Sequence, residues 1–268
     1  MTWTPKSGAQ EEATPAAING HQEDFVMASL YPTLSIIIKK VIKSVAFNTR
    51  LHRLLFNVYQ FGYGPTELIF LTDCVSSVSA IPGTFVEAGC AYGATTVFLN
   101  KFMEERNINR DYYAIDTFSG FNKTHLAYEA RQGRRLVGQW SNSRGVHHRY
   151  NLRSLFSDNR QSWFDKTMQF HGIAQVRSVK EDVSHFDFST IAPIAFCLLD
   201  VDFYLPIKES LPKIYNAMAP GGVLIVDDCR PNDQWDGALR AYEEFVEEKG
   251  MRREIVCEKL GLVRVHYQ

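Results

Sequence analysis

Residues 84–93 read Thr-Phe-Val-Glu-Ala-Gly-Cys-Ala-Tyr-Gly, and this stretch decides the fold of the chain. Residues 84–88 form a short, largely apolar run that is typical of a strand buried in a parallel sheet. Gly89 and Gly93 follow, and residues 94–106 repeat apolar side chains at helical spacing. Glycines allow the backbone to turn tightly and to approach a ligand closely. The stretch therefore predicts a strand, a tight turn and a helix, with a ligand site at the turn.

Apolar runs and helical patterns keep alternating along the chain after this unit. The expected elements are strands at residues 111–115, 175–179, 194–199 and 222–226 and helices at residues 206–218 and 237–249. Residues 254–258 and 262–266 are expected to pair as an antiparallel hairpin around Gly261 at the edge of the sheet. This order predicts the α/β class, with a Rossmann-like, mostly parallel sheet that is covered by helices on both faces.

The chain before and inside this domain has a different character. Residues 1–23 are rich in Pro, Ala, Gln and Glu and are expected to form a loose tail, whereas residues 24–83 are expected to be helical. Residues 84–268 form the expected α/β domain, which a long insertion at residues 117–171 interrupts. An insertion of this length usually has a function, and we expect it to fold over the ligand site as a lid.

Composition limits the classes of function. The chain has 268 residues, 45% of them hydrophobic, and a net charge of −1, so no basic excess points to nucleic acid. Its five cysteines form no C-x-x-C pair, which disfavours a disulfide framework or a zinc site and indicates a reducing, cytoplasmic environment. The apolar stretch 34–42 is too short to span a bilayer. We expect it to be a core helix, with a basic helix resting on a membrane as the alternative.

Two acidic residues at predicted strand ends suggest a nucleoside that carries a cation. Glu87 stands where a dinucleotide motif would begin with glycine, and a carboxylate there can hold an ammonium group. Asp116 ends the next strand, where an acid can accept both ribose hydroxyls. A plain turn and a helix cap are the alternatives. Asp182 is a weaker candidate for an adenine edge, since a solvated loop explains it equally well.

A second group of acids indicates a metal. Asp200, Asp202, Asp227 and Asp228 follow two strands whose carboxyl ends should lie side by side. Clustered carboxylates repel one another unless a cation intervenes, and oxygen ligands suit Mg²⁺ or Ca²⁺. We therefore expect these acids to hold a divalent metal, with helix capping as the alternative. Asp200 or Asp202 is also the expected catalytic base.

These motifs resemble the macrocin O-methyltransferase family over residues 64–250. The resemblance rests on residues 81–89, 116–121, 200–204 and 220–228. It implies a class I methyltransferase that uses S-adenosylmethionine and Mg²⁺ to methylate a hydroxyl of a natural product, such as a sugar. By this resemblance Asp200, Asp227 and Asp228 are the expected ligands of Mg²⁺. The resemblance and the local pattern together give this expected set of cofactor-binding residues: Glu87, Gly89, Tyr92, Gly93, Thr95, Asp116, Thr117, Phe118 and Asp182.

The acceptor is the least defined part of the prediction. The insertion concentrates basic side chains, and arginine pairs well with carboxylate or phosphate, so a small anionic acceptor is expected, with a solvated basic surface as the alternative. The arginines concerned are Arg131, Arg134, Arg135, Arg144, Arg149, Arg153 and Arg160. His147 and His148 are alternative bases. A catechol-like phenol as acceptor and a catalytically silent nucleoside-binding protein are the competing functions. A homo-oligomer is compatible with the sequence.

Overall fold

The computed structural model describes residues 37–38, 40–46, 48–49, 62–133, 136–141, 147–153, 155–231 and 236–265. The chain divides into two compact units, residues 1–45 and residues 46–268. In the first unit the described residues are helical, and the tail expected at residues 1–23 lies outside the described residues. No helix among the described residues has the length and apolar character needed to cross a membrane.

A seven-stranded sheet forms the centre of the second unit. Its strands are β1 (Thr84–Ala88), β2 (Tyr112–Asp116), β5 (Val176–Lys180), β6 (Ile194–Leu199), β7 (Met218–Val226), β8 (Ile255–Val256) and β9 (Leu260–Arg264). They lie in the order β5-β2-β1-β6-β7-β9-β8. Every pair from β5 to β7 is parallel, whereas β9 runs antiparallel to β7 and β8. The predicted α/β sheet with an antiparallel C-terminal hairpin is therefore confirmed.

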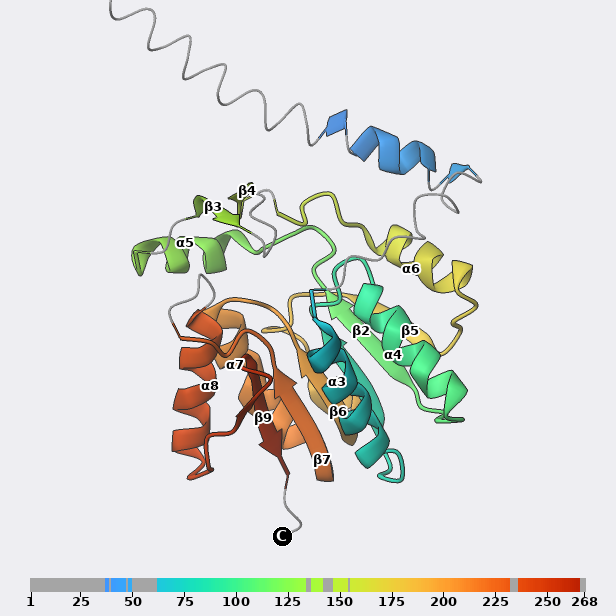
Figure 1. The fold of residues 1–268 in the computed structure, drawn as a ribbon, viewed down its shortest axis with the longest axis vertical. Coiled ribbons are helices and arrows are strands. Elements are labelled where there is room, and N and C mark those ends of the chain that lie inside the picture. The colour runs from blue at the N-terminus through green and yellow to red at the C-terminus, as the bar shows by residue number, and fades with distance from the viewer. Residues whose placement is uncertain are drawn as a thin grey trace, which may run out of the picture. The chain divides into compact units, whose positions relative to one another are not determined.

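Helices cover both faces of the sheet because its central strands are apolar on both sides. On one face lie α3 (Pro65–Ser77), α4 (Ala94–Glu105) and α6 (Gln161–Phe170); on the other lie α7 (Tyr204–Ala217) and α8 (Asp236–Glu248) (Figure 1). Phe85 of β1 packs in the cluster that contains α3 and α4, while its neighbour Val86 packs in the cluster that contains α7 and α8. Successive strand residues point to opposite faces, so one apolar run supports both layers.

The segment 117–171 that is expected to form a lid includes a helix of the core. The segment begins with α5 (Lys123–Arg131) and a small sheet of β3 (Val137–Ser141) and β4 (His147–Asn151), which Figure 1 shows beyond the ends of the parallel strands. It ends with α6, which belongs to the core, because Phe164 and Met168 pack against Ala114 of β2. Helix α6 is the crossover that connects β2 to its parallel neighbour β5.

The C-terminal hairpin turns three residues earlier than expected. Cys257 and Glu258 have positive φ values of 51° and 62° and form the turn, so Gly261 lies inside β9 instead. A Cβ at Gly261 would lie 2.7 Å from the Cys229 sulfur, which explains the glycine by packing. This correction matters for the site because the turn carries Lys259.

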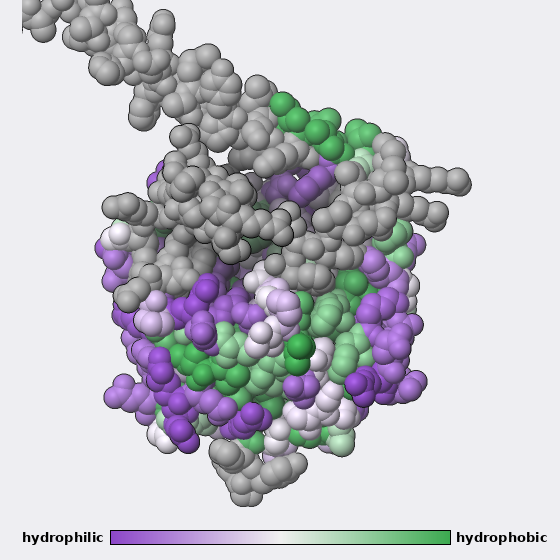
Figure 2. All heavy atoms as spheres, in the orientation of Figure 1, coloured by the Kyte–Doolittle hydropathy of each residue, from purple (hydrophilic) through white to green (hydrophobic). Residues whose placement is uncertain are grey.

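The visible face of the second unit carries an apolar area. Figure 2 shows hydrophobic residues gathered over the region of β7, β9 and α3, with hydrophilic residues around them. This is the face of the sheet on which α3 packs, and Ile69 of that helix is 61% exposed. Buried Leu71 and Val75 lie on the inner side of the same helix.

Candidate active site

A cleft of about 330 Å³ opens at the carboxyl ends of the parallel strands. Backbone hydrogen bonds continue past the strand ends there: Asp227 N–H donates to Leu199 O and Asp200 N–H donates to Ala88 O. The acids that follow β7 and β6 therefore stand next to the turn that follows β1. The predicted residues that line the cleft are Gly89, Asp116, Thr117, Asp182, Asp200, Asp202, Asp227 and Asp228.

The two glycines of the turn after β1 are required by packing. A Cβ on Gly89 would lie 1.8 Å from the carbonyl oxygen of Asp200, and its φ is +87°. Gly93 is the left-handed N-cap of α4, and a Cβ there would lie 2.7 Å from the Met168 methyl of α6. The sequence pattern predicts that a ligand approaches these glycines closely. The structure assigns the approach to neighbouring protein atoms, although Gly89 also lines the cleft.

Glu87 points into the protein interior. It is only 2% exposed, and its Oε2 atom accepts hydrogen bonds from the hydroxyls of Thr96 (2.6 Å) and Tyr112 (2.8 Å). Burial raises the pKa of Glu87 to about 7, although both hydroxyl donors oppose that rise. Glu87 is not among the described residues that line the cleft, so its contact with the cofactor ammonium stays a prediction.

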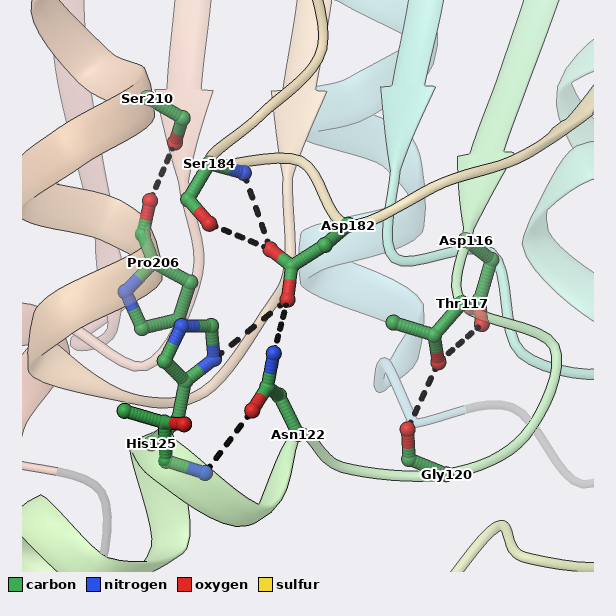
Figure 3. A network of polar contacts seen from close by, with 10 residues as sticks. Asp116, Thr117, Gly120, Asn122, His125, Asp182, Ser184, Pro206 and Ser210 are labelled. Carbon is green, nitrogen blue, oxygen red and sulfur yellow. Dashed lines mark hydrogen bonds and ion pairs between the residues drawn. The ribbon is translucent and has the colours of Figure 1, made fainter.

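Asp116 ties two loops of the cleft together. Its Oδ2 atom accepts the backbone N–H of Ala91 at 2.9 Å, and its Oδ1 atom accepts that of Phe118 at 2.7 Å. Burial raises the pKa of Asp116 in spite of these donors. A carboxylate offers about four acceptor positions, and the two N–H groups and the Thr117 hydroxyl, 3.5 Å from Oδ1, occupy up to three of them. Nearby, Thr117 donates its hydroxyl proton to Gly120 O and holds the following turn (Figure 3).

A polar network joins the end of β5 to α5. The Oδ1 atom of Asp182 accepts from the N–H and the hydroxyl of Ser184, and its Oδ2 atom accepts from the Asn122 amide at 2.8 Å. His125 Nδ1 lies 3.9 Å from the same Oδ2 atom (Figure 3). Burial lowers the pKa of His125 although the Asp182 charge opposes this. Asp182 thus anchors α5 beside the cleft, a role that its sequence did not suggest.

Four acids gather at the other end of the cleft, together with a buried lysine. The Tyr63 hydroxyl donates to Asp200 Oδ2 at 2.9 Å. The Lys259 ammonium donates to Asp227 Oδ2 at 2.8 Å and lies 3.7 Å from Asp228 Oδ1. It also lies 4.5 Å from the centroid of the Tyr63 ring. The predicted convergence of acids from two strand ends is therefore present, but it includes a cation that the chain itself supplies.

Two carboxyls of this group, Asp200 and Asp202, have shifted pKa values. Burial first, and then the charges of Asp227 and Asp228, raise the pKa of Asp200 well above its ordinary range. Burial and the charge of Asp200 raise the pKa of Asp202 in the same direction. Asp202 also has a left-handed φ of 63°, an uncommon conformation that tends to persist at functional sites. A raised pKa makes a carboxylate a stronger base.

The predicted magnesium site does not fit this arrangement. Mg²⁺ requires several oxygen ligands that are free to face one point. Asp227 Oδ2 is bound by the Lys259 ammonium and Asp200 Oδ2 by the Tyr63 hydroxyl. Over the part of the chain that the structure describes, no three acidic, His or Cys side chains are arranged to hold an ion. We therefore route no chemical step through a metal.

Comparison with known families identifies the chain. The macrocin-O-methyltransferase (TylF) family model matches residues 61–261. The protein belongs to this family. This TylF-family protein is therefore an S-adenosylmethionine-dependent O-methyltransferase, which confirms the expectation from the sequence motifs. No curated protein matches the chain.

Solved structures of O-methyltransferases share the fold of this TylF-family protein. The O-methyltransferase NovP matches with a TM-score of 0.59 and 17% identity over 76% of this chain and 81% of NovP. The calicheamicin methyltransferase CalS11 matches with a TM-score of 0.55 and 16% identity over 97% of this chain and 99% of CalS11. An apo structure of CalS11, named a TDP-rhamnose 3'-O-methyltransferase, gives a TM-score of 0.50 and 17% identity over 83% and 94% of the two chains.

Several residues assigned to the cofactor from the sequence of this TylF-family protein lie outside the described cleft lining. The Tyr92 hydroxyl donates to Asp158 at 2.6 Å, and Phe118 packs against Phe164 with ring centroids 5.3 Å apart. Thr95 is buried in the first turn of α4, which the left-handed Gly93 caps. Their assignment to the cofactor stays a prediction. The side chains of His147 and His148 lie outside the described residues.

The cleft of this TylF-family protein also contains residues that the sequence analysis missed. Described lining residues not singled out there include Gly62, Phe121, Asn122, His125, Arg230 and Lys259. Gly62 and Tyr63 come from the segment before α3, which no strand pattern marks. The described arginines Arg131, Arg153 and Arg160 are not among the described cleft-lining residues, and Arg160 stacks over the Trp163 ring. Arg230 is the arginine that lines the described cleft.

The buried Glu87 predicts a pH dependence of stability. Below pH 4.5 its carboxyl is neutral in both states, whereas between pH 4.5 and about 7 only the unfolded chain ionises, so the free energy of unfolding falls as the pH rises. The rise from 4.5 to about 7 corresponds to about 3 kcal/mol, at about 1.4 kcal/mol per pH unit. Glu87→Gln is expected to lose this decline. Urea unfolding of both proteins at pH 4.5–7.5 measures the difference, and parallel curves would contradict it.

Proposed function

We propose that this protein transfers a methyl group from S-adenosylmethionine to a hydroxyl of a small natural product, and that a sugar hydroxyl is the acceptor. The observation that carries the proposal is the cleft at the strand ends, with Asp116 and Asp182 toward one end and the Asp200 group at the other. Ligands of open α/β sheets bind in this crevice. Membership of the macrocin-O-methyltransferase family supports the reaction, and the name of CalS11 as a TDP-rhamnose methyltransferase supports a sugar acceptor.

The charge of the cleft suits the methyl donor. S-Adenosylmethionine carries a sulfonium and an ammonium cation, and the lining is rich in carboxylates. When bound, it supplies a methyl group whose transfer to the acceptor oxygen forms a C–O bond, breaks the C–S bond and releases S-adenosylhomocysteine and a proton. Asp116 lines the cleft and would accept a hydrogen bond from the ribose. Asp182 and Asn122 position the wall beside the adenine end.

The residues of the acid group would receive the acceptor proton. Asp200 and Asp202 both line the cleft, and the rise in their pKa values makes each a stronger base than an ordinary carboxylate. The Tyr63 hydroxyl fixes the Asp200 carboxylate by its hydrogen bond, so that the other oxygen stays aimed in one direction. A positioned carboxylate removes the proton while the neighbouring donor end holds the methyl group. This arrangement supplies proximity as well as base catalysis.

The segment around α5 is suited to cover the acceptor. Leu126 of α5 and Leu152 pack against Phe203, which lines the cleft, and Phe121 extends the same cluster. Glu129 of α5 accepts the backbone N–H of Tyr204 at the start of α7, at 3.0 Å. These contacts make α5 part of the cleft wall. Arg230, beside the Asp228 carboxylate, supports an anionic group on the acceptor, as a nucleotide sugar would have.

Loss of the Asp116 carboxylate tests the cofactor part of the proposal. Asp116→Ala is expected to weaken S-adenosylmethionine binding by about 1.5–3 kcal/mol, or about 10- to 150-fold, because a charge-assisted acceptor of the ribose hydroxyls is lost. Asp116→Asn keeps one acceptor oxygen, so its affinity for S-adenosylmethionine should lie between those of wild type and Asp116→Ala. Isothermal titration calorimetry with S-adenosylmethionine measures the affinities.

A matched control is available on the same strand. Asp111 stands next to the opposite end of β2 and forms a surface ion pair with Arg177, so Asp111→Ala should leave the affinity unchanged. Thermal unfolding checks that each variant is folded, because Asp116 also holds two backbone N–H groups. Wild-type affinity in a folded Asp116→Ala protein would remove Asp116 from the cofactor site.

A further inference from the structure

We propose that the Lys259 ammonium takes the place of a divalent metal at the acceptor end of the cleft. Its positive charge neutralises and positions the carboxylates of Asp200, Asp227 and Asp228. The inference rests on the proposed function, because it concerns the acceptor end of the same cleft. It differs from the metal site that the acidic motifs predict from sequence. Lys259 acts here as a positioning residue, since it orders the carboxylates that face the acceptor.

The Lys259 ammonium is buried between two carboxylates, as a bound cation would be. It lies 2.8 Å from Asp227 Oδ2 and 3.7 Å from Asp228 Oδ1, and the three side chains are at most 10% exposed. An ammonium at this depth is shielded little by solvent, so its field acts on all neighbouring carboxylates. Burial alone would lower the pKa of Lys259, but the charges of Asp227 and Asp228 outweigh burial and raise it.

The fold fixes the lysine at this point by main-chain bonds. Lys259 O accepts the N–H of Cys229, the residue after the acid pair, at 2.7 Å. The pairing of Val226 with Gly261 aligns β9 with the end of β7 and brings the hairpin turn beside Asp227. On the other side the ammonium faces the ring of Tyr63, whose hydroxyl binds Asp200. Tyr63 thus connects the cation to the third carboxylate, and cation–π attraction favours this geometry.

The carboxylate of Asp227 indicates how Lys259 opposes metal binding. Asp227 Oδ1 is buried and has no hydrogen-bond partner among the residues that the structure describes. If the ammonium is removed, Asp227 Oδ2 becomes free as well, and the nearby oxygens of Asp200 and Asp228 lose a neighbouring positive charge. The cluster would then be a set of oxygen ligands that attracts a hard divalent ion. Lys259 and a metal are therefore competitors for the same carboxylates.

A metal titration of the full chain tests the inference. Wild type, Lys259→Met and Lys259→Arg are stripped with EDTA and titrated with Mn²⁺ in a calorimeter. We expect wild type and Lys259→Arg to bind Mn²⁺ weakly and Lys259→Met to bind it at least about tenfold more tightly, because a like charge beside the ion is gone. Lys101→Met, an exposed lysine paired with Glu104, is the matched control and should behave as wild type.

Thermal unfolding gives a second measurement that remains informative if Lys259→Met is unstable. An ion at about 100 times its dissociation constant for Lys259→Met should raise the melting temperature of that variant by about 5 °C or more, and it should raise that of wild type by about half as much or less. Micromolar Mn²⁺ binding to wild type, or equal Mn²⁺ affinities of wild type and Lys259→Met, would overturn the inference. S-Adenosylmethionine titration of the same samples separates this result from the proposed function, since failure there would concern the cofactor end alone.

Discussion

Asp200→Asn is expected to lower kcat by at least about a hundredfold, because general base catalysis contributes about 10²- to 10⁴-fold and an amide cannot accept the hydroxyl proton. Asp200 lines the cleft at the end of β6, and Tyr63 holds its carboxylate in place. The substitution keeps the size of the side chain, so binding of S-adenosylmethionine should change much less than turnover. Methylated product is measured with the best acceptor from a panel of sugars, nucleotide sugars and phenols.

Two comparisons make this result specific. Asp202→Asn tests the second candidate base, and the larger loss of kcat of the two identifies the residue that takes the proton. Asp73→Asn removes an exposed acid of α3 and should leave kcat unchanged. If Asp200→Asn and Asp202→Asn both retained wild-type turnover, neither carboxylate would be the base. If phenols alone were methylated, the acceptor would be catechol-like instead of a sugar.

Gly89→Ala is expected to destabilise the fold by about 4 kcal/mol or more, which is exceptional for one methyl group. The new Cβ would lie 1.8 Å from the carbonyl oxygen of Asp200, and a main-chain atom in a central strand end cannot move aside cheaply. The positive φ of 87° adds about 1 kcal/mol of backbone strain. The free energy of unfolding in urea measures the effect, and the acid group should be displaced with Asp200.

Gly172→Ala separates the steric effect from the backbone strain. Gly172 also has a positive φ, +69°, but a Cβ there meets no atom within 4 Å. Its substitution should therefore cost about 1–2 kcal/mol from the backbone conformation alone. Equal destabilisation by Gly89→Ala and Gly172→Ala would show that the close approach of β1 to β6 does not matter.

The strands were predictable because burial on both faces leaves a local mark. Residues 84–88 and 194–199 are short apolar runs, and both became strands with those boundaries. The acids at the strand ends were predictable for the same reason, since parallel strands bring their carboxyl ends to one edge. Periodicity also located α4 and α8 to within one residue of their observed ends. These are all features that one segment of sequence carries by itself.

The partners of the acids were not predictable from local patterns. Lys259 reads as a solvated residue in a charged turn, and only the pairing of β9 with β7 brings it to Asp227. Tyr63 precedes a helix that the sequence did not connect with the cleft. Glu87 is the opposite case. Its position in the motif suggests a ligand contact, but in the fold its carboxylate accepts hydrogen bonds from Thr96 and Tyr112. Which neighbour a buried polar group has depends on the whole fold.

The place of α3 has a consequence for where the enzyme begins as a functional unit. The sequence sets the α/β domain to start at residue 84, yet α3 covers one face of the sheet with Leu71 and Val75, both fully buried. The segment just before it supplies Gly62 to the cleft and Tyr63 to Asp200. A shorter chain that began at residue 84 would retain all the strands that the structure describes and still be an incomplete catalyst. In a chimaeric enzyme, α3 and the segment before it would therefore have to be transferred together with the sheet, because they form part of the active site.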